Sequence, residues 1–323
     1  MPHTKGRMEV RKLVKSGNSS IVVSLPKAWV EENKLKQGDK VFIEESKESL
    51  ILKKEYKQKQ AEKKEKVVNI DGKSDRIIGR EIVSGYINNY QHIIFKGKAL
   101  NEKSQMIKKF VSELVALEVI DDSSERIVAR NFLNIYDTEL DVVLRRMDNI
   151  VRSMLIDMIE AVGNPTIVQN IVDRDKEVNK LNFLIAKILK AAHNDKDVAH
   201  AINIDDSQLL KYWEINIAIE KIGDRVKHMS TSIEGVQKSS HRLLKSLFQD
   251  LLEFYKSAMK TFYNNSIREA DEVSEAKFTI GDKINEFASH KCVACAQIAI
   301  NAFNLNGHIN DISRIVRYVA NDE

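Results

Sequence analysis

The chain has 323 residues, 43% of them hydrophobic and 30% charged, with three prolines and two cysteines. No apolar run approaches the ~20 residues that a helix needs to cross a bilayer, and the first residues lack the apolar core of a signal peptide. Two cysteines are too few for a disulfide framework. We therefore expect a cytoplasmic protein rich in long helices, without membrane insertion and with Cys292 and Cys295 as free, buried thiols.

The positive charge of the chain is concentrated at its N-terminus. Residues 1–66 hold 17 Lys and Arg against 10 Asp and Glu, a net charge of +7, whereas residues 67–323 have a net charge of −3. A basic segment of this kind indicates either a surface that binds nucleic acid or another polyanion, or a solvated lysine-rich surface with a charged linker.

Residues 7–54 predict a small module of strands, tight turns and one short helix. A basic strand at 11–15 leads into the turn Gly17-Asn18 and a second strand. Pro26 suits the first turn of a helix that carries Trp29, because proline lacks only a donor that would be unpaired there. Gly38-Asp39 marks a further turn before two more strands.

This module resembles the AbrB/MazE/SpoVT family of swapped-hairpin DNA-binding domains. The resemblance covers residues 7–54 and depends on SGNS, VSLPKAW and LKQGDKV in this order. It implies that DNA is a partner and that the protein is a homodimer through this domain, with two chains forming one intertwined barrel. The residues expected to face DNA lie on the first strand, its turn and the helix start: Arg7, Arg11, Lys12, Lys15, Asn18, Ser19 and Lys27.

A small α/β domain is predicted at 67–131, after a charged linker at 55–66. Strands are expected at 66–70 and 92–95 and amphipathic helices at 75–89 and 102–117, with two short strands near 118–120 and 126–129. No catalytic motif occurs in this domain.

From residue 137 onward the pattern is helical, so the fold class is mixed: a β-rich module, an α/β middle domain and an all-α C-terminal half. Helices are predicted at 137–162, 165–192, 206–236, 241–264, 266–289 and 292–320. Short loops make sequential helices neighbours, so we expect two tandem three-helix bundles, at 137–236 and 241–323.

The helical half resembles the PhoU family, whose fold is two tandem three-helix bundles. The third helix carries IEKIGDR at 219–225, similar to the family's E-R-I-G-D element, and the second carries DRDKEVNKL at 173–181, similar to its acidic D-x-x-x-D element. The order of domains resembles the archaeal PhoU-type phosphate uptake regulators.

Acidic side chains at helical spacing predict a metal site in the first bundle. Glu220 and Asp224 are four residues apart and share a helix face, as do Asp175 and Asn179 on the preceding helix. His228 lies one turn beyond. The family's acidic elements bind iron or zinc clusters, or magnesium, so the resemblance implies a divalent ion (Mg, Mn, Fe or Zn) held by Glu220, Asp224, Asp175, Asn179 and His228.

An alternative interpretation is that Glu220 and Asp224 pair with Lys176, Lys180 or Arg225 on a solvated face. In the second bundle three of the four corresponding positions, Lys277, Gly281 and Gly307, lack a carboxylate, and only Asp311 keeps one. No metal site is expected there.

These patterns indicate a DNA-binding regulator of phosphate uptake and homeostasis, not an enzyme. Its bundles are expected to relay phosphate status through a partner or a metal. The alternative function is an adaptor that acts on a phosphate transporter or a sensor kinase, with the N-terminal module used for dimerisation. The pair Cys292 and Cys295 lacks the two further ligands that zinc requires, and no nucleotide-binding or hydrolase motif is present.

Overall fold

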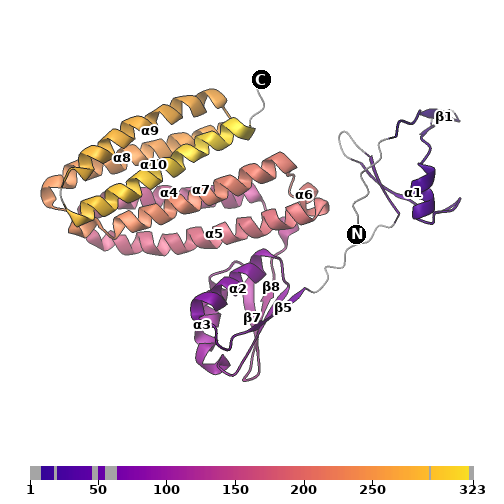
Figure 1. Ribbon diagram of the computed structural model, residues 1–323, viewed down its shortest axis with the longest axis horizontal. Coiled ribbons are helices and arrows are strands. Elements are labelled where there is room, and N and C mark those ends of the chain that lie inside the picture. The colour runs from indigo at the N-terminus through magenta and orange to yellow at the C-terminus, as the bar shows by residue number, and fades with distance from the viewer. Residues whose placement is uncertain (1–8, 18–19, 46–49, 55–63, 291, 320–323) are drawn as a thin grey trace. The chain divides into compact units, whose positions relative to one another are not determined.

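The computed structural model describes residues 9–17, 20–45, 50–54, 64–290 and 292–319. The chain divides into two compact units, residues 1–62 and 63–323. Figure 1 colours the chain from its N-terminus to its C-terminus. Arg7, Asn18 and Ser19, which the sequence places in the DNA-facing set, lie outside the described residues.

The N-terminal unit consists of two antiparallel hairpins and a short helix. Strand β1 (Val14–Ser16) pairs with β2 (Ser20–Val22), and β3 (Phe42–Glu45) pairs with β4 (Leu50–Lys53). Helix α1 (Lys27–Glu32) begins directly after Pro26. Gly17 has a φ of 70°, which a residue without Cβ adopts at no steric cost. The predicted order of strands, turns and helix is confirmed.

None of the described residues of this unit is fully buried. Apolar side chains on all four of its strands or beside them are exposed, namely Val10, Leu13, Val14, Ile21, Val22, Val23, Phe42, Ile43 and Leu50. The residues of this unit whose burial the structure describes therefore form no hydrophobic core in a single copy.

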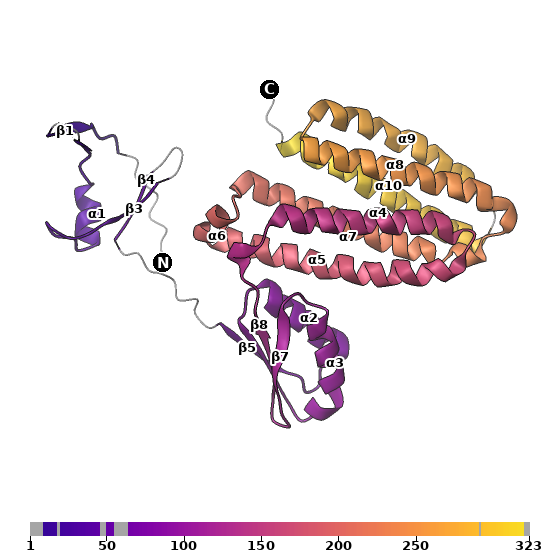
Figure 2. The ribbon, with the colours of Figure 1, turned by 180° about the vertical axis from the view of Figure 1, so that it is seen from behind.

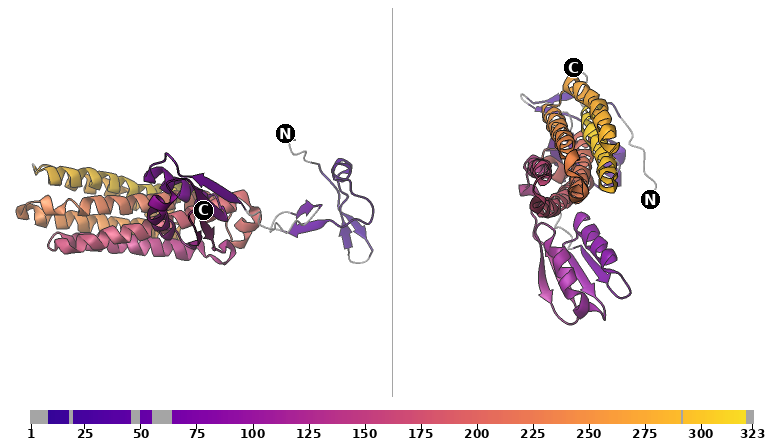
Figure 3. Two further views of the ribbon diagram at one scale, coloured as in Figure 1. Left: turned by 90° about the horizontal axis from the view of Figure 1, so that it is seen from below. Right: turned by 90° about the vertical axis from the view of Figure 1, so that its left-hand side faces the viewer.

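The α/β domain begins the second unit and contains a four-stranded sheet of order β5-β6-β8-β7. Its elements in chain order are β5 (Glu65–Asn69), α2 (Asp75–Ile87), β6 (His92–Lys96), α3 (Leu100–Ser112), β7 (Leu117–Asp122) and β8 (Ile127–Asn131). Strands β5 and β6 are parallel, while β8 is antiparallel to both of its neighbours. Both helices cover the same face of the sheet (Figure 3).

The core of this domain lies between that face and the two helices. Val68, Ile93 and Phe95 from the sheet pack on Ile82 and Ile107 from the helices, all with no exposed surface. The predicted second helix is wrong at its end: α3 stops at Ser112, and Ala116 turns the chain with a φ of 56° so that β7 can begin at Leu117.

Long helices make up the rest of the unit, as predicted from periodicity. They are α4 (Leu140–Ala161), α5 (Val168–Asn194), α7 (Asp206–Ser230), α8 (His241–Asn264), α9 (Ile267–Ala288) and α10 (Val293–Val319). The short α6 (Lys196–Ala201) was not expected, and α7 ends six residues before the predicted Val236. Short 3₁₀ turns are η1 (Ile135–Asp137), η2 (Pro165–Ile167), η3 (Ile233–Gly235) and η4 (Lys238–Ser240).

Helices α4, α5 and α7 pack against one another, and so do α8, α9 and α10. The two groups meet where α7 lies along α10 and α4 along α8 (Figure 2). Buried side chains from all six helices form one continuous hydrophobic core.

A buried lysine connects the α/β domain to this helical core. Lys187 of α5 has no exposed surface, donates a hydrogen bond of 2.9 Å to the Tyr86 carbonyl oxygen, and places its ammonium 4.6 Å from the centre of the Tyr86 ring. The Asn89 amide donates to the Lys187 carbonyl oxygen in return, at 3.3 Å. Burial lowers the pKa of Lys187 to about 8.

The expectation of free thiols is wrong in this structure, because Cys292 and Cys295 form a disulfide at the start of α10. The first turn of the helix brings residues at this spacing together, and the Cys295 amide donates to the Cys292 sulfur at 2.9 Å. Cys295 is buried, as the sequence predicted, whereas Cys292 is only half-buried.

Candidate functional site

Four of the residues predicted to face DNA, Arg11, Lys12, Lys15 and Lys27, are described by the structure, and all four are exposed. Lys12 and Lys15 lie on the first hairpin strand or directly before it, and Lys27 is the first residue of α1. Arg11 is exposed too, although its guanidinium pairs with Glu9, and the Lys27 ammonium lies 3.7 Å from the Glu31 carboxylate. These side chains are free of tertiary packing and accessible to a polyanion.

An acidic cluster forms where α5 packs on α7, because the two predicted motifs face each other. Asp175 is buried and Asp224 is half-buried, and both bind the same ammonium. The Lys227 Nζ donates to Asp175 Oδ2 and to Asp224 Oδ1, each at 2.7 Å. The Asn179 amide donates to the same Asp175 oxygen at 3.2 Å. Neither of the two lysines that the sequence suggested as partners, Lys176 and Lys180, takes this place.

The electrostatics of the cluster follow from this geometry. Burial raises the pKa of Glu220, and the negative charges of Asp224 and Asp175 raise it further. Partial burial would also raise the pKa of Asp224, but the hydrogen bond and the charge of Lys227 outweigh it and lower that pKa. Burial opposes the charge of Lys227, yet its bonds to both carboxylates raise the pKa of its ammonium. The hydrogen bonds of Lys227 to the carboxylates of both helices thus favour its charged form.

His228 turns away from the cluster. Its Nδ1 lies 2.6 Å from the Asp224 backbone carbonyl oxygen, and the ring is exposed. The Arg225 guanidinium reaches the second Asp224 oxygen at 3.3 Å and also Asn301 of α10 at 3.1 Å. In the part of the chain that the structure describes, no group of three or more His, Cys, Asp or Glu side chains is arranged to hold a metal ion.

The donor set as it stands does not fit a divalent ion. Oxygen ligands to such an ion must present free lone pairs, and three of the four Asp175 and Asp224 oxygens already accept from lysine, arginine or asparagine. The metal site thus stays a prediction. Sequence reasoning missed Lys227, although its position three residues after Asp224 puts it on the same face of the helix.

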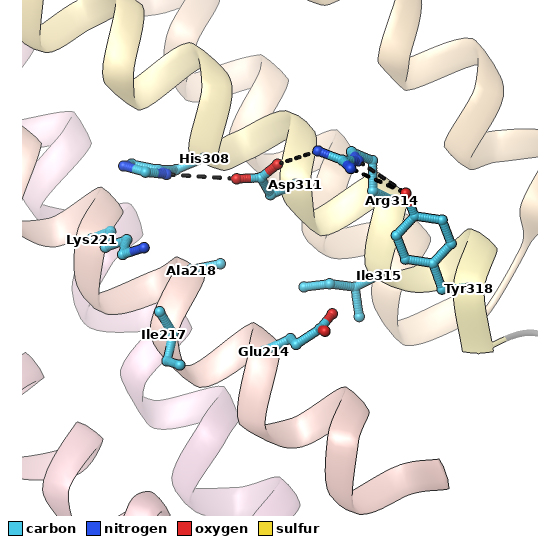
Figure 4. Close-up of a pocket in the computed structure, with 9 residues that line it drawn as sticks. All are labelled: Glu214, Ile217, Ala218, Lys221, His308, Asp311, Arg314, Ile315 and Tyr318. Atoms are coloured by element: carbon cyan, nitrogen blue, oxygen red, sulfur yellow. Dashed lines mark hydrogen bonds and ion pairs between the residues drawn. The ribbon is translucent and has the colours of Figure 1, made fainter.

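A groove of about 270 Å³ runs between α7 and α10 on another face (Figure 4). Ala218, Ile217 and Ile315 form its apolar floor. Charged and polar groups line its rim, namely Glu214, Lys221, His308, Asp311, Arg314 and Tyr318. Asp311 binds Arg314 at 3.3 Å, and burial together with nearby Lys221 lowers the pKa of His308. Positive and negative groups alternate, so the groove has no strong preference for either sign of charge.

Asp311 is the one carboxylate at the second bundle's corresponding positions, and it faces α7 in this groove. Lys277 and Gly281 lie on α9, where the Asn306 side chain donates to the Lys277 carbonyl oxygen at 2.9 Å. Asn306, the neighbour of Gly307, therefore contacts the α9 element, while Asp311 faces α7 instead.

A comparison with protein families identifies both resemblances. Residues 14–61 match the family described as Antidote-toxin recognition MazE, bacterial antitoxin, and residues 144–233 match the PhoU domain. The chain therefore carries a MazE/AbrB-type DNA-binding domain at its N-terminus and a PhoU domain in its helical half. No curated protein and no solved structure matched the chain. No described helix is both long and apolar enough to cross a membrane.

Proposed function

We propose that this chain, with a MazE-type domain ahead of a PhoU domain, is a DNA-binding regulator of phosphate uptake and homeostasis. The combination of the two domains is the observation that carries the proposal. Both families are regulatory and non-catalytic, so the proposal includes no enzymatic activity. In this function the basic N-terminal unit contacts promoter DNA, and the tandem helical bundles relay phosphate status through a protein partner.

The proposed DNA-facing surface consists of Arg11, Lys12, Lys15 and Lys27, with Arg7, Asn18 and Ser19 beside them in sequence. Their exposure and the net charge of +7 over residues 1–66 support it. Lysine and arginine that neutralise phosphates release counterions, so log K should fall with log salt at a slope near −0.9 per phosphate contacted.

The test is a titration of the chain's own promoter region at several salt concentrations. Lys12→Ala/Lys15→Ala should weaken binding to every sequence and flatten the slope by about 2 for each copy of the unit that contacts DNA, since each lysine contributes about one contact. The matched control is Lys238→Ala/Lys245→Ala in the helical half, which should leave both affinity and slope unchanged. Binding that does not depend on salt, or an equal loss in both variants, would contradict the proposal.

We further propose that the N-terminal unit is a homodimer. The absence of buried residues among those described in this unit supports it, because an isolated module of this size with its apolar residues exposed does not offset the entropy cost of folding. Two interleaved copies would cover those residues with each other. Deletion of residues 1–62 should therefore leave a protein whose mass, measured by light scattering, is that of a single truncated chain. An unchanged dimer after this deletion would place the interface in the helices.

The alternative is an adaptor for a phosphate transporter or sensor kinase, in which the N-terminal module only dimerises. The concentration of positive charge on that module favours DNA binding, since dimerisation alone needs no such charge. A promoter titration without any salt-dependent binding, combined with an intact dimer, would support the adaptor.

A further inference from the structure

The acidic cluster of α5 and α7 already contains a cation that belongs to the chain. The Lys227 ammonium lies 2.7 Å from one carboxylate oxygen on each helix. We propose that this ammonium is the resident cation of the cluster, that it fills the place of a divalent ion between Asp175 and Asp224, and that removing it creates a metal site.

The hydrogen-bond inventory supports this assignment. Asp175 Oδ2 accepts from Lys227 and Asn179, and the two Asp224 oxygens accept from Lys227 and Arg225 respectively. A divalent ion at this position would have to displace the ammonium or lie next to it, and two like charges at such distances repel strongly in a partly buried site. The lysine is covalently attached, so it competes with a free ion without losing translational freedom.

The lysine also offsets the cost of burying a carboxylate in this cluster. Asp175 is only 6% exposed, and a carboxylate at that depth needs a compensating partner. Asp175 and Asp224 accept from one ammonium, which ties α5 to α7 at the same place where a bridging ion would. The lysine thus joins the two helices as a bridging metal ion would.

Lys227→Met tests the proposal, because methionine has a similar volume and no charge. The variant removes the ammonium that bridges Asp175 and Asp224, and carboxylate oxygens are donors that suit Mn²⁺. We expect calorimetric titration with Mn²⁺ to detect about one ion per chain, and Mn²⁺ to raise the melting temperature by several degrees. The wild-type chain should bind no Mn²⁺ at this cluster and should melt identically with and without EDTA.

Lys176→Met is the matched control. Lys176 lies on α5 near the cluster, and its ammonium pairs with exposed Asp173 at 2.7 Å. This variant should behave as the wild type in both measurements. A second variant, Lys227→Arg, keeps the positive charge and should also bind no Mn²⁺.

Three results would overturn the proposal. The first is Mn²⁺ binding by the wild type that Glu220→Gln/Asp224→Asn abolishes, which would mean that metal and lysine coexist. The second is a folded Lys227→Met protein that binds no Mn²⁺. If Lys227→Met does not fold even with Mn²⁺, Lys227→Gln is tested in its place. The third result is that neither variant folds or gains stability when Mn²⁺ is added. None of these measurements involves DNA, so their outcome is independent of the proposed regulator function.

Discussion

The two units of the chain differ in how much of their apolar surface is buried. The helical part of the second unit gathers side chains from six helices into one continuous core, whereas the described residues of the N-terminal unit include none that is fully buried. The second unit also contains buried polar anchors such as Asp148 and Lys187. We infer from this difference that the second unit specifies its own fold, while the first depends on a partner.

The largest effect should come from breaking a buried anchor of the second unit. Asp148 of α4 is 3% exposed, binds Arg152 through two hydrogen bonds of 2.8 and 3.0 Å, and accepts from the Tyr263 hydroxyl of α8 at 3.1 Å. Asp148→Ala leaves the partly buried arginine unpaired, so we expect unfolding free energy to fall by about 3–5 kcal/mol in urea titrations. The control Asp173→Ala removes an exposed carboxylate and should leave the urea midpoint unchanged. Equal effects of the two substitutions would contradict the role of burial.

A smaller effect, with a specific pH dependence, is expected for Lys187. The unfolded chain binds a proton at this lysine with a pKa near 10.5 and the folded chain with a pKa of about 8. Between these values the unfolded state binds more protons, so stability rises with pH. Relative to Lys187→Met, the wild type should gain about 2 to 3 kcal/mol between pH 7 and pH 10. Lys190→Met, on a partly exposed part of the same helix, is the control. The same pH dependence in both variants would contradict the assignment to Lys187.

Two isoleucines of equal exposure, one in each unit, test whether the N-terminal unit is covered by a second copy. Ile43 of β3 and Ile300 of α10 are both 62% exposed in the single chain. If the N-terminal unit is covered by a second copy, Ile43→Asp should raise the dissociation constant of the dimer by roughly 10- to 100-fold. This factor corresponds to the free energy of about 1.5–3 kcal/mol gained by burying one such side chain. Ile300→Asp should leave the dimer unchanged. The measurement is sedimentation equilibrium over a range of concentrations, and equal effects would argue against an interface at Ile43.

The sequence was sufficient for features that depend on local pattern. Hydrophobic periodicity of 3.6 residues predicted the long helices, and turn residues such as Gly17 predicted the hairpin. The alternation of strands and helices predicted the α/β domain, but not the strand order, because pairing between β6 and β8 depends on contacts distant in sequence. The ends of elements were predicted less accurately. The apolar residues after Ser112 continue a helical pattern in the sequence, but α3 ends at Ser112 and Ala116 turns the chain with a positive φ before β7.

Side-chain partners were the part that sequence could not supply. The opposition of Asp175 and Asp224 across two helices was expected, yet the choice of Lys227 over Lys176 or Lys180 depends on the rotation of α7 against α5. Lys187 did have a visible signal, since it interrupts the apolar run FLIAKIL at 183–189. Its acceptor, the Tyr86 carbonyl oxygen, lies 101 residues earlier and carries no sequence signature.

That separation of 101 residues has a consequence for the order of events on the ribosome. The strands and helices of the α/β domain emerge before α5 has been synthesised, and domains generally fold from the N-terminus during synthesis. The sheet and its two helices should therefore be assembled while the surface around Tyr86 is still bare. Synthesis of α5 then covers it with Lys187, so we expect this contact to form after the α/β domain has folded and before α7 to α10 have been synthesised.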